Sequence, residues 1–382
     1  MRDTGQRNRR QKAEDRSQKS EVRSQNKNIY FFISVFCILY SVFYISGCAG
    51  VVPPPEKKLI HPKKAEEEKP PHPEVIVLKD NERKSEDYAV IIASPSDTYE
   101  LLSEKYYGDK RLSYIITEFN QSQPITPHKE VIIPLKSLNP SGLYPDGYQI
   151  IPILCYHQFS KTKSKDKMVV NEEMFDKQMA YLKENNYNVI TLREFFDFVS
   201  YKRRPPKNSI VITIDDGWSN VKTIATPILK KYGFKATLFV YTDLIKSSKI
   251  TLSWDDIKEM LNDGVIDVQS HTKFHTDLSK TKDNESEGAY IKHLEKEIGE
   301  SQRIIEQRLG VKPTFLAYPY GTFNDAVIDT LKKYQYEGAF TVIRGGNPFF
   351  YNNFSLNRSM VFNSEKIEDF IKQLETFKKE QL

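Results

Sequence analysis

The chain has 382 residues, so we expect two folded units with tails rather than one domain. Hydrophobic residues make up 39% of the sequence and the mean hydropathy is −0.56, which permits a sizeable core inside a very polar surface. The net charge of +5 comes entirely from the first 47 residues, which hold 9 basic and 4 acidic side chains, and the remainder is balanced. This balance excludes a nucleic-acid-binding surface on the main body of the chain.

Residues 1–48 are predicted to form an export signal. A basic stretch that ends at Lys27 precedes an apolar run at residues 29–45, and a Ser-Gly-Cys triplet ends at Cys48. This order is typical of a secretory signal. A Cys at that point resembles the bacterial lipobox, which implies a lipidated Cys48 and an extracytoplasmic, membrane-anchored lipoprotein of the cell envelope, periplasm-facing or in the outer membrane. The alternative is an uncleaved anchor, because about 17 apolar residues lie near the lower limit for a membrane span.

Residues 49–86 are rich in Pro, Lys and Glu, a composition that predicts an extended linker. Of the three cysteines, Cys37 lies in the apolar run and Cys48 is the lipid candidate, so Cys155 alone remains in the exported part. A single thiol cannot form an internal disulfide, and stability must therefore come from packing. Cys155 lies in an apolar segment and is expected to be a small core residue.

Residues 87–136 are predicted to form a small domain. It should contain a strand, two helices and a second strand, at residues 88–92, 99–107, 112–119 and 131–134. This βααβ order, with Asp97 and Thr98 before the first helix, resembles the LysM module, which implies binding to chains that contain N-acetylglucosamine. The sequence departs from that module at Ser96, where a glycine usually precedes the Asp. The alternative is a structural spacer with the same fold.

Residues 137–149 are rich in turn-forming residues and are expected to link this domain to a larger one at residues 150–380. In the larger domain, apolar segments alternate with amphipathic ones. Strands are predicted at residues 149–156, 188–191, 209–214, 236–241, 265–268, 314–318 and 338–342. Helices are predicted at residues 172–185, 193–200, 221–232, 254–263, 285–309 and 325–334. Such alternation predicts an α/β fold, a distorted (β/α) barrel of about seven parallel strands.

Three short segments follow the ends of predicted strands, where α/β barrels place their functional groups. They are residues 213–217 (TIDDG), 270–275 (SHTKFH) and 318–321 (YPYG). Each alone could be an ordinary turn or surface loop. Together they supply an Asp and two His side chains that zinc accepts as ligands, and a second Asp that can act as a base. The set therefore predicts a metal-dependent hydrolytic site, with His157 on the same face after strand 149–156.

These motifs resemble the polysaccharide deacetylase family (NodB homology, carbohydrate esterase family 4) over residues 150–373, and in particular its poly-β-1,6-N-acetylglucosamine deacetylases. The resemblance implies removal of N-acetyl groups from a polysaccharide that contains N-acetylglucosamine, either peptidoglycan or poly-N-acetylglucosamine. It also implies that Asp215 is the catalytic base and that the Tyr320 backbone N–H stabilises the oxyanion. The implied ligands of a divalent metal, most simply Zn²⁺, are Asp216, His271 and His275.

Two positions depart from the family pattern. Ala317 stands where many members have the arginine that braces the base, so Arg358 is the candidate brace, with a surface salt bridge as the alternative. The late His that protonates the leaving amine is also missing, because no His follows His293. His157 is the best substitute for that acid, with a buried hydrogen-bonding role as the alternative.

Trp218, Pro319 and the Tyr320 side chain are expected to bind the sugar, although Trp218 could equally be a core residue. Asp255 is a weaker candidate for a supporting role near the metal. The missing late His keeps a second function open, that of a glycan-binding envelope lipoprotein whose deacetylase domain no longer turns over.

Overall fold

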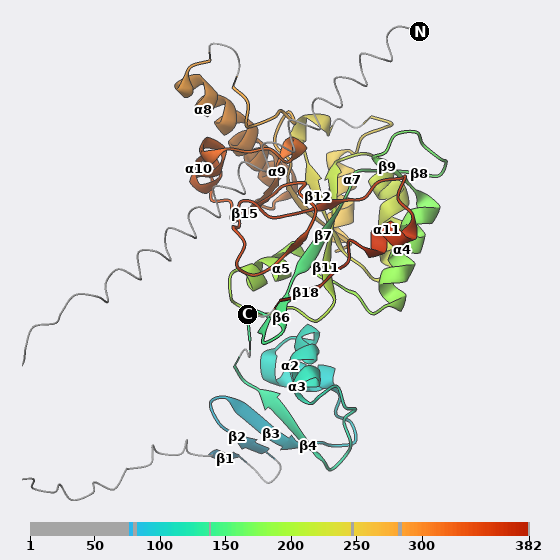
Figure 1. The fold of residues 1–382 in the computed structure, drawn as a ribbon, viewed down its shortest axis with the longest axis vertical. Helices are drawn as coiled ribbons and strands as arrows, with labels where there is room; N and C mark the ends of the chain where they lie inside the picture. The colour runs from blue at the N-terminus through green and yellow to red at the C-terminus, as the bar shows by residue number, and fades with distance from the viewer. Residues whose placement is uncertain (1–75, 79–81, 137–138, 246–247, 282–284, 381–382) are drawn as a thin grey trace, which may run out of the picture. The chain divides into compact units, whose positions relative to one another are not determined.

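The computed structural model describes residues 76–78, 82–136, 139–245, 248–281 and 285–380, which form a small domain and a large domain (Figure 1). The expected export signal, including Cys48, and most of the expected linker lie outside the described residues. Among the residues that are described, no helix is both long and apolar enough to cross a bilayer.

The small domain has the predicted strand–helix–helix–strand order and one additional hairpin. Its antiparallel sheet runs in the order β1 (Ile76–Leu78), β2 (Glu82–Lys84), β3 (Tyr88–Ile92) and β4 (Glu130–Pro134). The helical elements are α2 (Tyr99–Tyr107), η1 (Lys110–Leu112) and α3 (Ser113–Phe119). Thr98 starts α2 because its side chain accepts from the Leu101 N–H, and Gly108 ends α2 in a left-handed conformation. Strands β1 and β2 lie in the segment expected to be linker.

The large domain is built on one curled, mostly parallel sheet in the order β15-β14-β13-β12-β11-β7-β16, with β10 paired to β11 and β17 paired to β7. Its parallel strands are β7 (Ile151–Tyr156), β10 (Asn188–Val189), β11 (Ser209–Asp216), β12 (Ala236–Val240), β13 (Ile266–Ser270), β14 (Phe315–Ala317), β15 (Gly338–Phe340) and β17 (Ser359–Met360). Strand β16 (Gly346–Asn347) pairs antiparallel with β7. The predicted α/β fold, a distorted barrel of parallel strands, is confirmed as a curled half-barrel, and β16 and β17 were not predicted.

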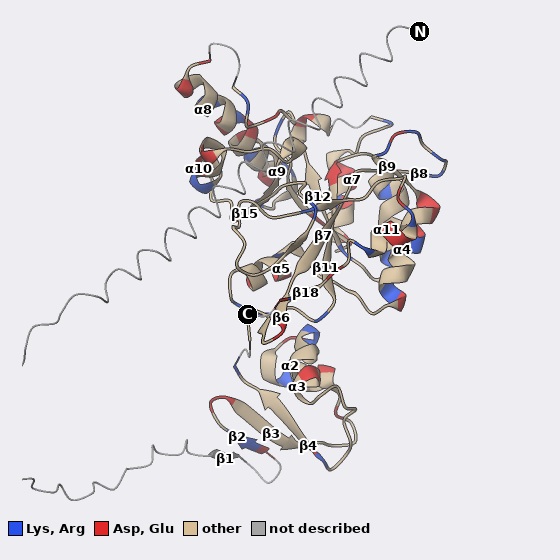
Figure 2. Ribbon diagram, in the orientation of Figure 1, with Lys and Arg blue, Asp and Glu red and all other residues tan. Residues whose placement is uncertain are grey.

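Helices connect the parallel strands, as predicted. They are α4 (Glu172–Glu184), α5 (Leu192–Val199), α6 (Thr226–Tyr232), α7 (Trp254–Asn262), α8 (Glu287–Glu295), α9 (Ser301–Leu309) and α10 (Asp325–Lys333). The short helix α11 (Ile367–Ile371) follows the last parallel strand and was not predicted. Two of the predicted helices contain a π-helical turn: η2 (Val221–Ala225) precedes α6, and η4 (Lys296–Glu300) separates α8 from α9. Residues of both charge signs lie along α4 and α10 (Figure 2).

Two small sheets complete the large domain. Strands β5 (Leu143–Tyr144) and β6 (Gly147–Gln149) join β18 (Phe377–Lys379) in the order β18-β6-β5. The segment expected to be a linker therefore pairs with the C-terminal part of the chain. Strands β8 (Gln158–Ser160) and β9 (Val169–Asn171) pair beside the carboxyl end of β7.

Candidate active site

Two adjacent carboxylates end strand β11 and lie in different surroundings. The Asp215 side chain is fully buried, whereas Asp216 is partly exposed and has a φ of 81°. Gly217 follows with a φ of 119°, and a Cβ on it would lie 2.6 Å from the Ile245 Cδ1 atom. The backbone can therefore turn at this point only because the residue is a glycine. The two carboxylates point in different directions because they are consecutive residues of a strand.

Asp216 meets the two histidines that follow β13. Its Oδ1 atom lies 3.8 Å from the Nε2 atoms of both His271 and His275. In a tetrahedral zinc site with bonds of about 2.1 Å, neighbouring ligand atoms are about 3.4 Å apart. The three donors thus need only small shifts to hold a divalent cation, and their chemistry, two imidazole nitrogens and one carboxylate, suits zinc, cobalt, nickel or iron.

Outer contacts orient two of these ligands. The His271 Nδ1 atom lies 2.8 Å from the carbonyl oxygen of Ala317, so Nδ1–H donates and Nε2 presents its lone pair to the site. Burial is the main reason that the pKa of His271 falls to about 4, which keeps the ring neutral at physiological pH. The Trp218 indole N–H donates to Asp216 Oδ2 at 2.9 Å, opposite the atom that faces the histidines. Trp218, expected to bind sugar, is thus placed to orient a metal ligand.

Asp215 is paired with Arg358 inside the protein. The Arg358 guanidinium donates to both carboxylate oxygens, at 2.7 and 2.8 Å, and also to the Thr341 carbonyl at 3.1 Å. The exposed fraction of Arg358 is 0%, which is incompatible with the alternative of a surface salt bridge. Burial alone would raise the pKa of Asp215, but the charge of Arg358 and its hydrogen bonds outweigh it, so this pKa lies well below its usual range.

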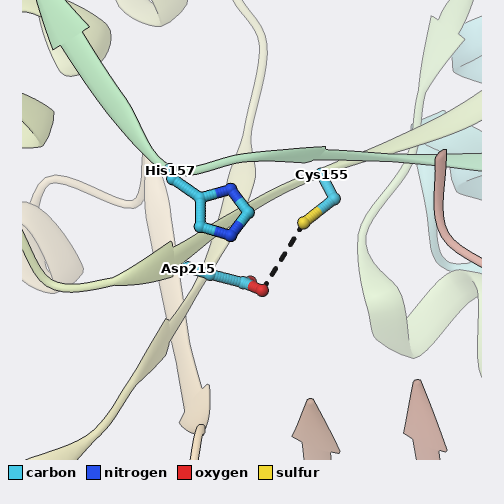
Figure 3. Close-up of side chains that lie close together, drawn as sticks. All are labelled: Cys155, His157 and Asp215. Carbon is cyan, nitrogen blue, oxygen red and sulfur yellow. Dashed lines mark hydrogen bonds between the residues drawn. The ribbon is translucent and has the colours of Figure 1, made fainter. Parts of the chain in front are cut away.

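Two side chains from β7 and its end approach the Asp215 carboxylate (Figure 3). Cys155 lies in β7, and His157 is the residue directly after it. Donor atoms of Cys155, His157 and Asp215 all lie within 4.8 Å of one another. The Cys155 thiol donates to Asp215 Oδ2 at 3.5 Å, and burial raises the pKa of this thiol so that it stays protonated. The sequence predicted that Cys155 is buried, but its contact with the base was missed, since only the pairing of β7 with β11 reveals it.

The third motif forms the turn η5 (Pro319–Gly321) beside the metal ligands. Tyr320 has a φ of 60°, and its 61% exposed side chain lies edge-on to the His275 ring at 5.0 Å. Gly321 has a φ of 74°, and a Cβ there would lie 2.6 Å from a methyl group of Val342. The glycine lets the turn pack closely against the strand end, next to the candidate metal site. Asp255, by contrast, is exposed in the first turn of α7.

Comparisons with known proteins agree with this geometry. Residues 202–339 match the sequence profile described as polysaccharide deacetylase. The Bacillus subtilis protein YxkH is 28% identical over 211 residues, which cover 55% of this chain and 71% of that protein. The poly-β-1,6-N-acetyl-D-glucosamine N-deacetylase of Staphylococcus aureus MRSA252 is 29% identical over 179 residues, 46% of this chain and 61% of that enzyme. The alignment therefore spans about three fifths of the staphylococcal enzyme.

A solved structure has the same architecture. The Streptococcus pyogenes deacetylase PplD, in complex with acetate, superposes with a TM-score of 0.54 and 27% identity, over 59% of this chain and 98% of that one. The curled parallel sheet and the polar side chains at its carboxyl end define a hydrolase with the polysaccharide N-deacetylase fold. The large domain is therefore similar to polysaccharide deacetylases, among them a poly-β-1,6-N-acetyl-D-glucosamine N-deacetylase.

Proposed function

We propose that this protein removes N-acetyl groups from an N-acetylglucosamine-containing polysaccharide of the cell envelope, with a divalent metal held by Asp216, His271 and His275. One observation carries the proposal. The ligand triad and the buried Asp215–Arg358 pair lie side by side, since Asp215 Oδ2 is 3.8 Å from the Nε2 atom of His271. A metal site and a fixed general base are the two parts that hydrolysis of an amide by water needs.

Asp216, His271 and His275 would hold a divalent cation, which would supply a Lewis acid for the acetamide carbonyl and lower the pKa of water. Asp215 is proposed to take the proton from that water. Its low pKa keeps the carboxylate ionised at neutral pH, so it can accept a proton, and a lowered pKa of the water makes the transfer less unfavourable. Arg358 holds the carboxylate in one orientation through two parallel hydrogen bonds, so the proton acceptor does not have to be reoriented during the reaction.

The leaving amine needs a proton, and His157 is proposed to deliver it. It follows β7 at the same end of the sheet as Asp215, and its ring lies beside that carboxylate (Figure 3). The backbone N–H of Tyr320 is proposed to donate to the oxyanion from the opposite motif. The exposed Tyr320 ring is proposed to contact the sugar, whereas Pro319, which was also expected to do so, is buried.

The test is acetate release by the chain that begins after Cys48, with and without a chelator, alongside Asp215→Asn. Release should require metal and should fall by a factor of about 10² or more in the variant, because general base catalysis contributes about 10²–10⁴-fold. No metal-dependent release from any N-acetylglucosamine polymer would refute the proposal. Glycan binding without release would instead support the non-catalytic lipoprotein.

Two polymers should be compared in that assay. The staphylococcal relative, by its name, acts on poly-β-1,6-N-acetyl-D-glucosamine, which favours an exopolysaccharide. The LysM-like small domain favours peptidoglycan, and we propose that it tethers the enzyme to its substrate by binding glycan. Glycan pull-down with the full chain and with a chain that lacks residues 87–136 tests that role.

Attachment to the membrane through a lipidated Cys48 also remains a proposal. The expected linker would then hold the catalytic domain away from the bilayer. Replacement of Cys48 by serine should release the protein from the membrane fraction if lipid is the anchor. Retention of the serine variant in membranes would support the alternative of an uncleaved apolar anchor.

A further inference from the structure

The loop that carries both histidine ligands has a strained backbone. Between β13 and the start of α8, Thr272 has a φ of 71° and His275 a φ of 58°, and neither is a glycine. Residues other than glycine rarely adopt this left-handed backbone conformation. It persists only where the surrounding structure holds it in place. The contacts that hold this loop therefore decide whether His275 stays in position for a metal.

A buried carboxylate from a distant helix makes three of these contacts, beside the backbone hydrogen bonds from Thr242 and Asp243. Glu297 lies in η4 and has an exposed fraction of 0%. Its Oε2 atom accepts from the backbone N–H groups of Lys273 and Phe274, at 3.1 and 2.9 Å. Its Oε1 atom accepts from the Thr276 hydroxyl at 2.7 Å. Burial of a carboxylate is costly unless hydrogen bonds compensate it, and here both oxygens are used on the ligand loop.

The helix that bears Glu297 departs from regular geometry at this point. Residues Lys296–Glu300 form a π-helical turn between α8 and α9, a feature that is frequent at functional sites. Gly299 lies in the same turn, and a Cβ there would lie 2.3 Å from the Tyr334 ring. The widened turn and the close packing on Tyr334 place Glu297 beneath the loop.

We propose that Glu297 is a positioning residue for the metal centre, which acts by fixing the backbone on both sides of His275. The proposal rests on the proposed metal-dependent function. Phe274 and Thr276, which both donate hydrogen bonds to Glu297, directly flank His275. His271 has its own support, because its ring donates to the Ala317 carbonyl at the end of β14. Loss of Glu297 should therefore displace His275 while His271 stays in place.

The test is a Co²⁺ titration of the chain that begins after Cys48, without substrate. Glu297→Ala should raise the Kd for Co²⁺ by about 10- to 100-fold, the usual effect of losing an outer partner of a metal ligand. It should also change the visible absorption of bound Co²⁺, since one imidazole is misplaced. Glu297→Gln should largely restore both, because its amide oxygen can accept from the two N–H groups and its NH₂ can donate to the Thr276 hydroxyl.

A matched control is Glu300→Ala, which changes a glutamate three residues further along the same π-helical turn. Glu300 pairs with the side chain of Lys273 rather than with the loop backbone, so Co²⁺ affinity should stay close to the wild-type value. If Glu297→Ala does not fold, Thr276→Val removes one of the three hydrogen bonds and should weaken Co²⁺ binding by a smaller factor.

Wild-type affinity and absorption in Glu297→Ala, or in Thr276→Val if that variant is used, would overturn this inference alone. No Co²⁺ binding by the wild-type chain would overturn both this inference and the proposed metal-dependent function.

Discussion

Replacement of Arg358 by methionine tests whether the buried ion pair supports the base. Methionine keeps an unbranched apolar side chain but removes both hydrogen bonds to Asp215 and the guanidinium contact with the Phe239 ring. Because Asp215 and Arg358 are both fully buried, the variant leaves an uncompensated buried carboxylate. Breaking such a pair costs about 3–5 kcal/mol of folding free energy. For a protein whose total stability is about 5–15 kcal/mol, this is a large fraction.

The assay is urea unfolding at neutral pH, with Asp215→Asn and the double variant as controls. The double variant should lose less stability than the sum of the single losses, since replacing both partners leaves no unpaired charge. Additive losses, within about 0.5 kcal/mol, would show that the two side chains are not coupled and would refute the reasoning.

The pH dependence provides a second check with a definite sign. In the wild-type protein the folded pKa of Asp215 is lowered, so its contribution is fully present above the unfolded pKa of about 3.9 and is lost as pH falls through the lower folded pKa. In Arg358→Met, burial should raise the folded pKa instead. The free energy of unfolding of Arg358→Met is therefore lowered at neutral pH, and it should rise as the Asp215 carboxylate becomes protonated. The stability difference between the two proteins should therefore narrow between pH 7 and pH 4.

Three further predictions concern the site. Trp218→Phe should weaken metal binding by about 10- to 100-fold with little change in the unfolding midpoint, because it removes only the indole donor to Asp216, and calorimetric metal titration checks this. Gly217→Ala should cost about 1–3 kcal/mol in urea unfolding, since φ is 119° and the added methyl group meets Ile245. His157→Gln should lower kcat by about 10²–10⁴-fold in the acetate-release assay without weakening Co²⁺ binding, and unchanged kcat would exclude it as the general acid.

The predicted strands and helices were confirmed most closely where the hydrophobic period is strong and local. Strand β11 and helix α4 agree with their predicted segments to within a few residues. Strand β17 was missed because two residues carry no detectable period, and it exists only through its pairing with β7. The hairpin of β1 and β2 was missed for a related reason, since its charged and proline-flanked sequence is typical of a linker until β3 offers a partner edge.

Within the candidate site, the sequence could identify donors but not their partners. Asp216, His271 and His275 were predicted as metal ligands from their types and from their places after predicted strands. The sequence could suggest Arg358 only as one of two alternatives, because 143 residues separate it from Asp215. The order of β7 and β11 in the sheet, with β17 beside β7, brings them together. Glu297 was not predicted at all, since a glutamate on a helix is usually a solvated residue.

The sequence by itself therefore determined the alternation of strands and helices and the residue types at the strand ends, because both depend on local periods and local order. Only the tertiary structure decided how these residues support one another. The Asp215–Arg358 pair, the Trp218 contact with Asp216 and the Glu297 contact with the ligand loop each join segments through burial and hydrogen-bond geometry. Such contacts depend on which strands become neighbours and on where a helix widens, and no local sequence pattern encodes either.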